Sequence, residues 1–269
     1  MDYSTQQLRN ISIAGHGQTG KTTLFEHLLF VGGVLPKAEA VASGKTASDN
    51  SPEEIQRKIS VYSSLAHIAW KDSLINMWDT PGSSDFSGEV ISAFRSSELA
   101  LMVVDSRSGA QIETIKLWRD LDRRNKPRIA FLNHCEDDRA DYDGSVQDIR
   151  KKFSVEVCPV TIPMGIGADF KGVIDVLHGK AYLVAGDGAV EKACDIPAEY
   201  KDEYEDALGV LAGAAAEGDD DLLVKFIDEG ELTQEEIITG LKIAVANNRI
   251  VPSFAGLHCR HCSRPIPRH

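Results

Sequence analysis

Gly15-His16-Gly17-Gln18-Thr19-Gly20-Lys21-Thr22 decides the fold, because it fits the phosphate-loop pattern G-x-x-x-x-G-K-[ST] without a mismatch. In this pattern, glycines let backbone N–H groups turn inward around phosphate oxygens at the start of a helix. Lys21 is expected to reach the β- and γ-phosphates, and the Thr22 hydroxyl to ligate Mg²⁺. An apolar run at 11–14 predicts a strand before the loop, and helical spacing predicts a helix over 21–31 after it.

Outside this loop, short apolar strands alternate with amphipathic helices. The alternation predicts an α/β fold of the P-loop NTPase type, with a doubly wound, mostly parallel sheet covered by helices on both faces. Residues 36–60 are polar and weakly periodic, which predicts a long loop of the kind that is usually functional. The predicted elements are a hairpin at 61–70 and 74–78, helices at 86–97 and 112–124, and strands at 100–104 and 128–132.

The pattern changes after about residue 154, where strands at 157–163 and 172–184 precede three helical segments. A last strand at 250–255 resumes the apolar pattern. We therefore expect a main domain of residues 1–153 and 248–257 and an inserted α+β subdomain at 154–247. A divergent tail at 258–269 is expected to be disordered. The three helical segments are 197–213, 222–228 and 235–246.

A second motif, Asp79-Thr80-Pro81-Gly82, ends the third predicted strand. An aspartate at this place in phosphate-loop enzymes holds Mg²⁺, and the glycine N–H can contact the γ-phosphate. Such a tetrapeptide is also a common turn. Its position after a phosphate loop and a long polar loop favours the metal-binding interpretation.

Taken together, these motifs resemble the translational GTPases, and most of all the GTP-binding domain of elongation factor G. The resemblance extends to about Gly256 and includes Arg57-Lys58-Ile59-Ser60, Asp85-Phe86 and 127–133. It implies a guanine nucleotide, GTP or GDP, with Mg²⁺ held by Thr22 and Ser60 and, through a bound water, by Asp79. It also implies slow GTP hydrolysis that the ribosome stimulates when the domain is part of a complete factor, and a cytoplasmic location.

The resemblance carries the expected site residues with it. Lys21, Asp79 and Ser83 are the candidates for catalysis, and residues 37–60 and 82–95 are the expected switch segments. The candidate nucleotide contacts are Gly15, His16, Gly17, Gln18, Thr19, Gly20, Lys21, Thr22, Thr23, Asp79, Thr80, Pro81, Gly82, Asn133, His134, Glu136, Gly256 and Leu257.

Three positions depart from the family pattern. Ser83 stands where the family has a histidine that helps to position the attacking water, and Gln18 stands where an aspartate is common. The base-reading motif Asn-Lys-x-Asp is replaced by Asn133-His134-Cys135-Glu136. Glu136 keeps the charge that reads guanine but is one methylene longer. A GTPase, a hydrolysis-deficient binding module and an ATPase without guanine specificity therefore remain as alternatives, in that order.

Composition excludes several other classes. The 269 residues carry 29 Lys+Arg against 41 Asp+Glu, a net charge of −12, which argues against broad binding to nucleic acid or anionic membranes. No signal peptide and no apolar run of membrane-spanning length is found. Five cysteines predict reduced thiols, and the pair Cys259 and Cys262 lacks the second pair that a zinc site needs.

Overall fold

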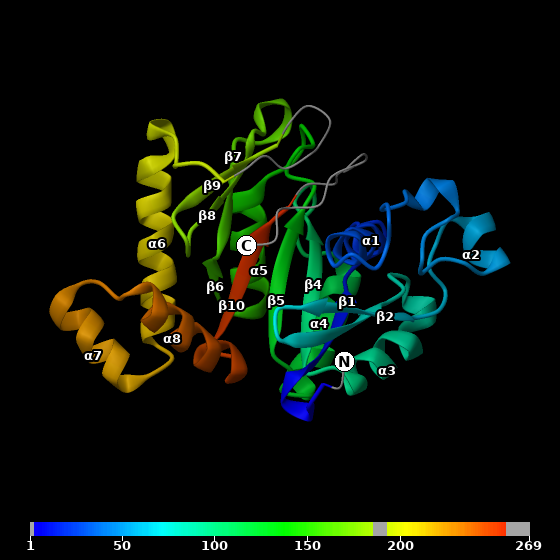
Figure 1. Cartoon of the computed structure of the whole chain (residues 1–269), viewed down its shortest axis with the longest axis horizontal. Coiled ribbons are helices and arrows are strands. Elements are labelled where there is room, and N and C mark those ends of the chain that lie inside the picture. Colours follow the sequence, from blue (N-terminus) through cyan, green and yellow to red (C-terminus); the bar gives the residue numbers. More distant parts are fainter. Residues whose placement is uncertain (1–2, 185–192, 257–269) are drawn as a thin grey trace.

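A seven-stranded sheet runs through the centre of the computed structural model, which describes residues 3–184 and 193–256. Its strand order is β2-β3-β1-β4-β5-β10-β6, and only β2 runs antiparallel to its neighbour. The α/β class with a mostly parallel sheet is therefore confirmed (Figure 1). The strands are β1 (Leu8–Ala14), β2 (Ser64–Trp70), β3 (Ser73–Asp79), β4 (Leu99–Asp105), β5 (Arg128–Asn133), β6 (Glu156–Pro159) and β10 (Ile250–Ala255).

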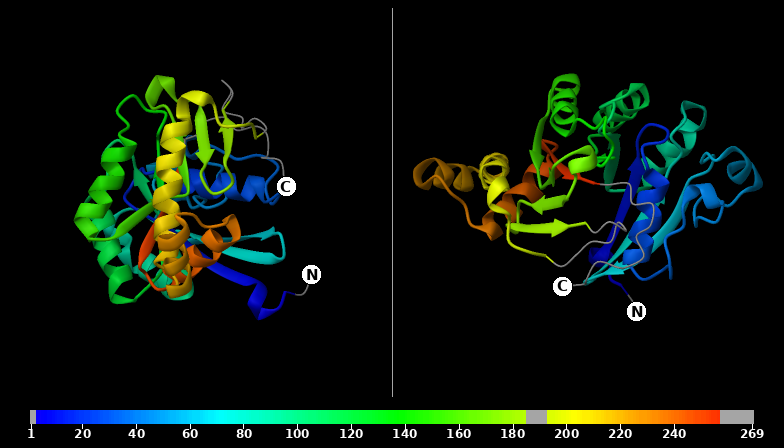
Figure 2. Two further views of the ribbon diagram at one scale, coloured as in Figure 1. Left: turned by 90° about the vertical axis from the view of Figure 1, so that its left-hand side faces the viewer. Right: turned by 90° about the horizontal axis from the view of Figure 1, so that it is seen from above.

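Alternate side chains of the central strand β4 enter two separate cores. Met102 and Val104 pack with α3, α4 and α5, whereas Leu101 and Val103 pack with α1 on the opposite face. Both faces of the sheet are therefore covered, and the right-hand view of Figure 2 shows α4 and α5 in green on one side. The helices are α1 (Lys21–Val31), α3 (Ser87–Ser96), α4 (Ile112–Arg123) and α5 (Tyr142–Phe153).

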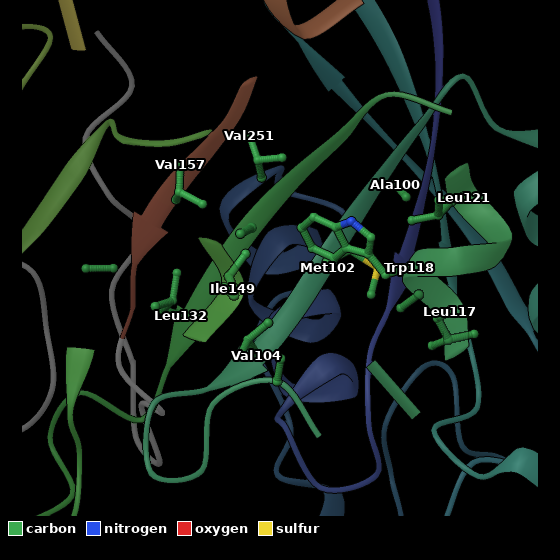
Figure 3. Packing of buried hydrophobic residues seen from close by; sticks show 14 of the residues in the cluster. Ala100, Met102, Val104, Leu117, Trp118, Leu121, Leu132, Ile149, Val157 and Val251 are labelled. Carbon is green, nitrogen blue, oxygen red and sulfur yellow. The ribbon is translucent and has the colours of Figure 1, made fainter. Parts of the chain in front are cut away.

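The core beneath α4 is built around Trp118, which is 2% exposed (Figure 3). Its ring stacks on Phe153 of α5 with the ring centroids 4.1 Å apart. The Arg128 guanidinium lies 5.0 Å from the centroid of the same indole, and its Nη1 donates to Asp122 Oδ1 at 2.7 Å. This contact joins the start of β5 to the end of α4 and leaves the opposite ends of the strands free for the loops of the site.

A second unit lies at the β6 edge of the large sheet. It contains the antiparallel sheet β7-β8-β9 and three helices, of which α6 and α8 pack on Cys158 and Ile250 at that edge (Figure 1). The elements are β7 (Thr161–Met164), β8 (Gly172–Asp175), β9 (Lys180–Leu183), α6 (Lys201–Ala216), α7 (Asp220–Glu229) and α8 (Gln234–Ala246). The expected tail at 258–269 and Leu257 lie outside the described residues.

Four local predictions need correction. The strand expected at 157–163 is two strands, β6 and β7, which belong to different sheets, and the one expected at 172–184 is divided between β8 and β9 by a turn. The loop expected at 36–60 contains a helix, α2 (Pro52–Arg57), which starts with a capping box between Ser51 and Glu54. Helix α5 has no counterpart among the predicted elements, although the Asp141 carboxylate caps its start by accepting from the Gly144 N–H.

No helix among residues 3–184 and 193–256 is both long and apolar enough to cross a bilayer.

The close approach of α6 and α8 gives a prediction about stability. A Cβ on Gly240 would lie 2.2 Å from the Ala215 carbonyl oxygen, whereas a Cβ on Gly209 would meet nothing within 4 Å. We expect Gly240→Ala to lower the free energy of unfolding by about 1–3 kcal/mol, because the helices must separate. The control Gly209→Ala is expected to raise it by about 0.5–1 kcal/mol through helix propensity. Urea denaturation measures both, and equal stabilisation by the two substitutions would contradict the packing.

Candidate functional site

The phosphate loop, residues 15–22, connects β1 to α1 at the carboxyl edge of the sheet. Its first residue lies so close to β4 that a Cβ on Gly15 would be 2.2 Å from the Val103 carbonyl oxygen, and its φ is +149°. The first turn of α1 holds no acidic residue. The positive end of the helix dipole and its unpaired N–H groups therefore face the loop without a competing carboxylate, which is the arrangement that binds anions.

Lys21 is almost completely buried, with 6% of its surface exposed. Its Nζ donates to the His16 carbonyl oxygen at 2.8 Å. Burial lowers the pKa of Lys21 to about 8, although the charges of Asp79 and Asp49 raise it in part. The ammonium is thus still mostly protonated at neutral pH but poorly solvated, which suits it to binding an anion.

Three oxygen-bearing side chains from distant parts of the chain meet beside Lys21. The Thr22 hydroxyl donates to Asp79 Oδ2 at 2.8 Å, and Ser60 Oγ lies 3.3 Å from Thr22 Oγ1. Asp79 is 2% exposed, and its Oδ1 has no hydrogen-bond partner among the residues that the structure describes. Burial raises the pKa of Asp79 to about 6, against the opposing effects of the Thr22 hydrogen bond and the Lys21 charge.

This donor set fits Mg²⁺. Magnesium prefers hard oxygen ligands and binds proteins through one or two carboxylates or hydroxyls while keeping several waters. An unpartnered buried carboxylate oxygen on Asp79, with the hydroxyls of Thr22 and Ser60 beside it, offers that chemistry.

Asp49 belongs to the same cluster but was not singled out from the sequence. It is 5% exposed, and within the described part of the chain its Oδ1 has no hydrogen-bond partner. Asp49 lines the same cavity as Lys21 and Ser60. Burial raises its pKa, and a hydrogen bond with Ser60 opposes that rise. Asp49 sits in a polar loop with no motif of its own, so only the fold reveals its position.

Two carboxylates bind backbone N–H groups of the loop that carries Asp49 and Ser60, or of the residues directly after it. Glu26 of α1 is fully buried and accepts the backbone N–H groups of Glu39 and Ala47. The Glu54 carboxylate accepts those of Val61 and Tyr62 at 3.0 and 3.1 Å. These bonds hold the polar loop against the phosphate loop.

A cavity of about 600 Å³ opens between these elements. Its volume is in the range of ligand-binding clefts. Most of the expected phosphate-side contacts line it together with Ser60 and Ser83. The other five expected contacts on this side are buried and do not belong to the lining that the described residues form: Gly15, Thr19, Asp79, Thr80 and Pro81. Its lining includes His16, Gly17, Gln18, Gly20, Lys21, Thr22, Thr23, Asp49, Lys58, Ile59, Ser60, Gly82 and Ser83.

The expected catalytic position Ser83 lies at the rim of this cavity. Its hydroxyl accepts the Asp85 N–H at 3.3 Å and caps the short turn Ser84–Phe86. The hydrogen bond of the Ser83 hydroxyl therefore stabilises this turn.

Asn133 joins the base-reading segment to the phosphate loop. It is 3% exposed and ends β5, where its Nδ2 donates to the Thr19 carbonyl oxygen at 2.9 Å. Gly256 lies beside it, because its carbonyl oxygen accepts the Cys135 N–H at 3.2 Å.

The neighbouring residues His134 and Glu136 lie outside the cavity lining described above. His134 is buried with a φ of +64°, and its Nδ1 lies 3.4 Å from Asp105 Oδ1. Glu136 is half-buried, and the next residue, Asp137, accepts hydrogen bonds from Arg107 and Arg139. The structure thus brings most of the phosphate-side residues into one cavity and places His134 and Glu136 on a loop that Asn133 joins to the phosphate loop.

Comparisons of the sequence and of the structure with known proteins agree with one another. The sequence profile described as "Elongation factor Tu GTP binding domain" matches residues 6–248. The chain is 37% identical over 251 residues to elongation factor G of Thermotoga sp. (strain RQ2) and of Thermotoga maritima, which covers 93% of this chain and 36% of each relative. A crystal structure of a Thermus thermophilus protein superposes with a TM-score of 0.86 at 28% identity, covering 94% of this chain and 38% of that one. The chain thus spans little more than a third of the length of these relatives.

The tight contact at Gly82 gives a prediction about the site. A Cβ there would lie 2.5 Å from Lys21 Nζ and 2.8 Å from the Gly17 nitrogen. We expect Gly82→Ala to displace the phosphate loop, to lower the free energy of unfolding by about 1–3 kcal/mol and to weaken GDP binding. Thermal unfolding and calorimetric titration measure the two effects.

Gly88→Ala serves as the matched control, since a Cβ on Gly88 would meet nothing within 4 Å. Wild-type GDP affinity in the Gly82→Ala variant would contradict the arrangement.

Proposed function

Because this chain belongs to the family of elongation factor Tu GTP-binding domains, among the translational GTPases, we propose that it binds GTP and GDP with Mg²⁺ in the manner of elongation factor G. We further propose that it hydrolyses GTP slowly until a ribosome stimulates it. The convergence of the Thr22, Ser60 and Asp79 oxygens at the phosphate loop carries this proposal.

Each residue of the phosphate side has a role that follows from its position. The N–H groups of the phosphate loop and of the first turn of α1 surround the phosphates, and the Lys21 ammonium neutralises their charge. Thr22 and Ser60 would offer their hydroxyls to Mg²⁺, and the buried Asp79 carboxylate would help to hold the ion through a water. When bound, the metal neutralises charge that develops between the β- and γ-phosphates.

Ser60 and Asp49 connect nucleotide state to loop position. Both lie in the segment 37–60, which Glu26 of α1 holds through the Glu39 N–H and in which Glu54 binds the backbone of Val61. Contacts to the γ-phosphate and its metal are expected to order this segment and the segment 82–95, and hydrolysis to release them. We assign nucleotide binding to residues 1–153 and 248–257, with 154–247 as the inserted subdomain.

Asn133 and Glu136 are the proposed readers of the base. Glu136 stands at the acidic position of the base-reading motif, which favours it as the carboxylate that accepts from the guanine N1–H and amino group. A site that hydrogen-bonds a substrate group discriminates strongly only when its geometry is right, so a loosened base preference, and with it an ATPase, is the alternative that the longer side chain favours.

Ser83 favours a second candidate function, a hydrolysis-deficient module that binds nucleotide and engages a partner. A serine hydroxyl that already accepts the Asp85 N–H has less reach toward an attacking water than the histidine of the family pattern. Small GTPases with an intact site hydrolyse GTP at about 10⁻⁴ s⁻¹ alone and gain up to roughly 10⁵-fold from an activator. Stimulated hydrolysis, rather than the basal rate, therefore separates the two functions.

Calorimetric titration with GDP, GTP, ADP and ATP in the presence of Mg²⁺ tests the proposed function. We expect both guanine nucleotides to bind, with ADP and ATP at least about tenfold weaker. Lys21→Ala is expected to abolish binding, because it removes the buried ammonium from the phosphate cavity. Equal affinity for ADP and GDP would refute guanine specificity, and unchanged GDP binding by Lys21→Ala would refute the site.

Phosphate release with and without ribosomes tests the catalytic half of the proposal. We expect ribosomes to accelerate release by the wild-type chain, and Ser83→His to increase the stimulated rate further, because imidazole can reach the attacking water. Ser96→His, at an exposed position near the end of α3 and outside the residues that line the cavity, is the control and should leave the rate near that of the wild type. Wild-type release that ribosomes leave unchanged, together with intact GTP binding, would identify the hydrolysis-deficient module instead.

A further inference from the structure

A cluster of opposite charges joins the ends of β4 and β5 behind the base-reading loop. The Arg107 guanidinium donates from Nε to Asp105 Oδ1 at 2.8 Å and from Nη2 to Asp105 Oδ2 at 2.5 Å. Its third nitrogen, Nη1, donates to Asp137 Oδ2 at 3.2 Å. A single arginine side chain thus bridges the last residue of β4 and the loop that follows β5.

The cluster is sheltered enough to restrain the loop. The side chains of Asp105, Arg107 and Asp137 are 9%, 27% and 25% exposed. Burial raises the pKa of Asp105, but hydrogen bonds from His134 and Arg107 outweigh it and hold that pKa well below its usual range. A planar guanidinium that binds a carboxylate with two parallel bonds fixes direction as well as distance, which a lysine cannot do.

The residues that this cluster holds flank Glu136. His134 lies two positions before it and meets Asp105, and Asp137 follows it and meets Arg107. The segment is a tight turn, closed by the Asp137 N–H donating to the His134 carbonyl oxygen at 3.1 Å. On its other side Asn133 ties the turn to the phosphate loop. The backbone around Glu136 is therefore held from both sides.

We propose that Arg107 is a positioning residue that sets the preference for guanine, by holding the turn 134–137 so that Glu136 meets the base. This inference rests on the proposed function. A glutamate is one methylene longer than the aspartate of the family pattern, so its backbone must stay drawn back for the carboxylate to fit. Arg107 supplies that restraint through Asp137 and Asp105, and it also keeps the Asp137 carboxylate from competing for the base.

The ratio of GDP to ADP affinity in the Arg107→Ala variant tests this role. We expect the ratio to fall by about tenfold or more, while the affinity for inorganic pyrophosphate with Mg²⁺ stays unchanged, because the phosphate loop does not touch Arg107. Arg107→Lys keeps the charge but not the planar fork, so its ratio should lie between those of the wild type and the alanine variant. Asp137→Asn removes the charge that pairs with Arg107 and with Arg139, leaves the Arg107 pair with Asp105 in place, and should also lower the ratio.

Arg123→Ala is the matched control, because it breaks a comparable pair with Asp120 on α4, 3.0 Å long and away from the site. It should leave the ratio unchanged. If Arg107→Ala does not fold, Arg107→Lys and Asp137→Asn carry the same test.

Two failures are distinguishable. Equal GDP and ADP affinity in the wild type would refute the proposed guanine specificity itself. A wild type that prefers GDP, with variants that retain its ratio or lose pyrophosphate in the same proportion, would overturn the role of Arg107 alone.

Discussion

The hydrogen bond from the Thr22 hydroxyl to Asp79 Oδ2, 2.8 Å long, is the contact on which the arrangement of the site depends. It joins the start of α1 to the end of β3, and the parallel pairing of β1 with β3 sets its length by placing Ile13 opposite Asp79. Thr80 reinforces the register by donating from its hydroxyl to the Ile13 carbonyl oxygen at 2.7 Å. The sheet thereby delivers a hydroxyl, a carboxylate and the amino end of a helix to one point.

Burial explains the electrostatics of the site. Lys21 and Asp79 lie almost wholly out of water, and burial shifts each pKa toward the neutral form, down for the lysine and up for the aspartate. Asp49 follows Asp79 in this respect. An anionic phosphate beside Lys21 and a divalent cation beside the two carboxylates would relieve these costs together. The charged side chains of this site are poorly compensated by one another, which suits the site to binding a phosphate and a divalent cation. Their burial lowers the stability of the fold at the place where function needs them.

Much of the fold was predictable from local pattern. The phosphate loop with its flanking strand and helix is one continuous stretch of sequence, and the Asp79 motif is another. Elements that depend on the surroundings were not predictable: β6 and β7 form one apolar run and separate only because two sheets meet there. Helix α5 was not predicted, although Val146, Ile149 and Phe153 have helical spacing and face the core. Asp49 and Arg107 carry no motif. Ser60 lies 11 residues from Asp49 and Asp137 lies 30 residues from Arg107, so only the tertiary structure reveals these contacts.

The crystal structure of this chain with Mg²⁺ and a non-hydrolysable GTP analogue tests the central claim most directly. The account predicts the hydroxyl oxygens of Thr22 and Ser60 both about 2.1 Å from the metal, and Asp79 one water further out. It also predicts a guanine base against Asn133 and Glu136. A metal bound without Ser60, or phosphates lying outside the loop at residues 15–22, would contradict it.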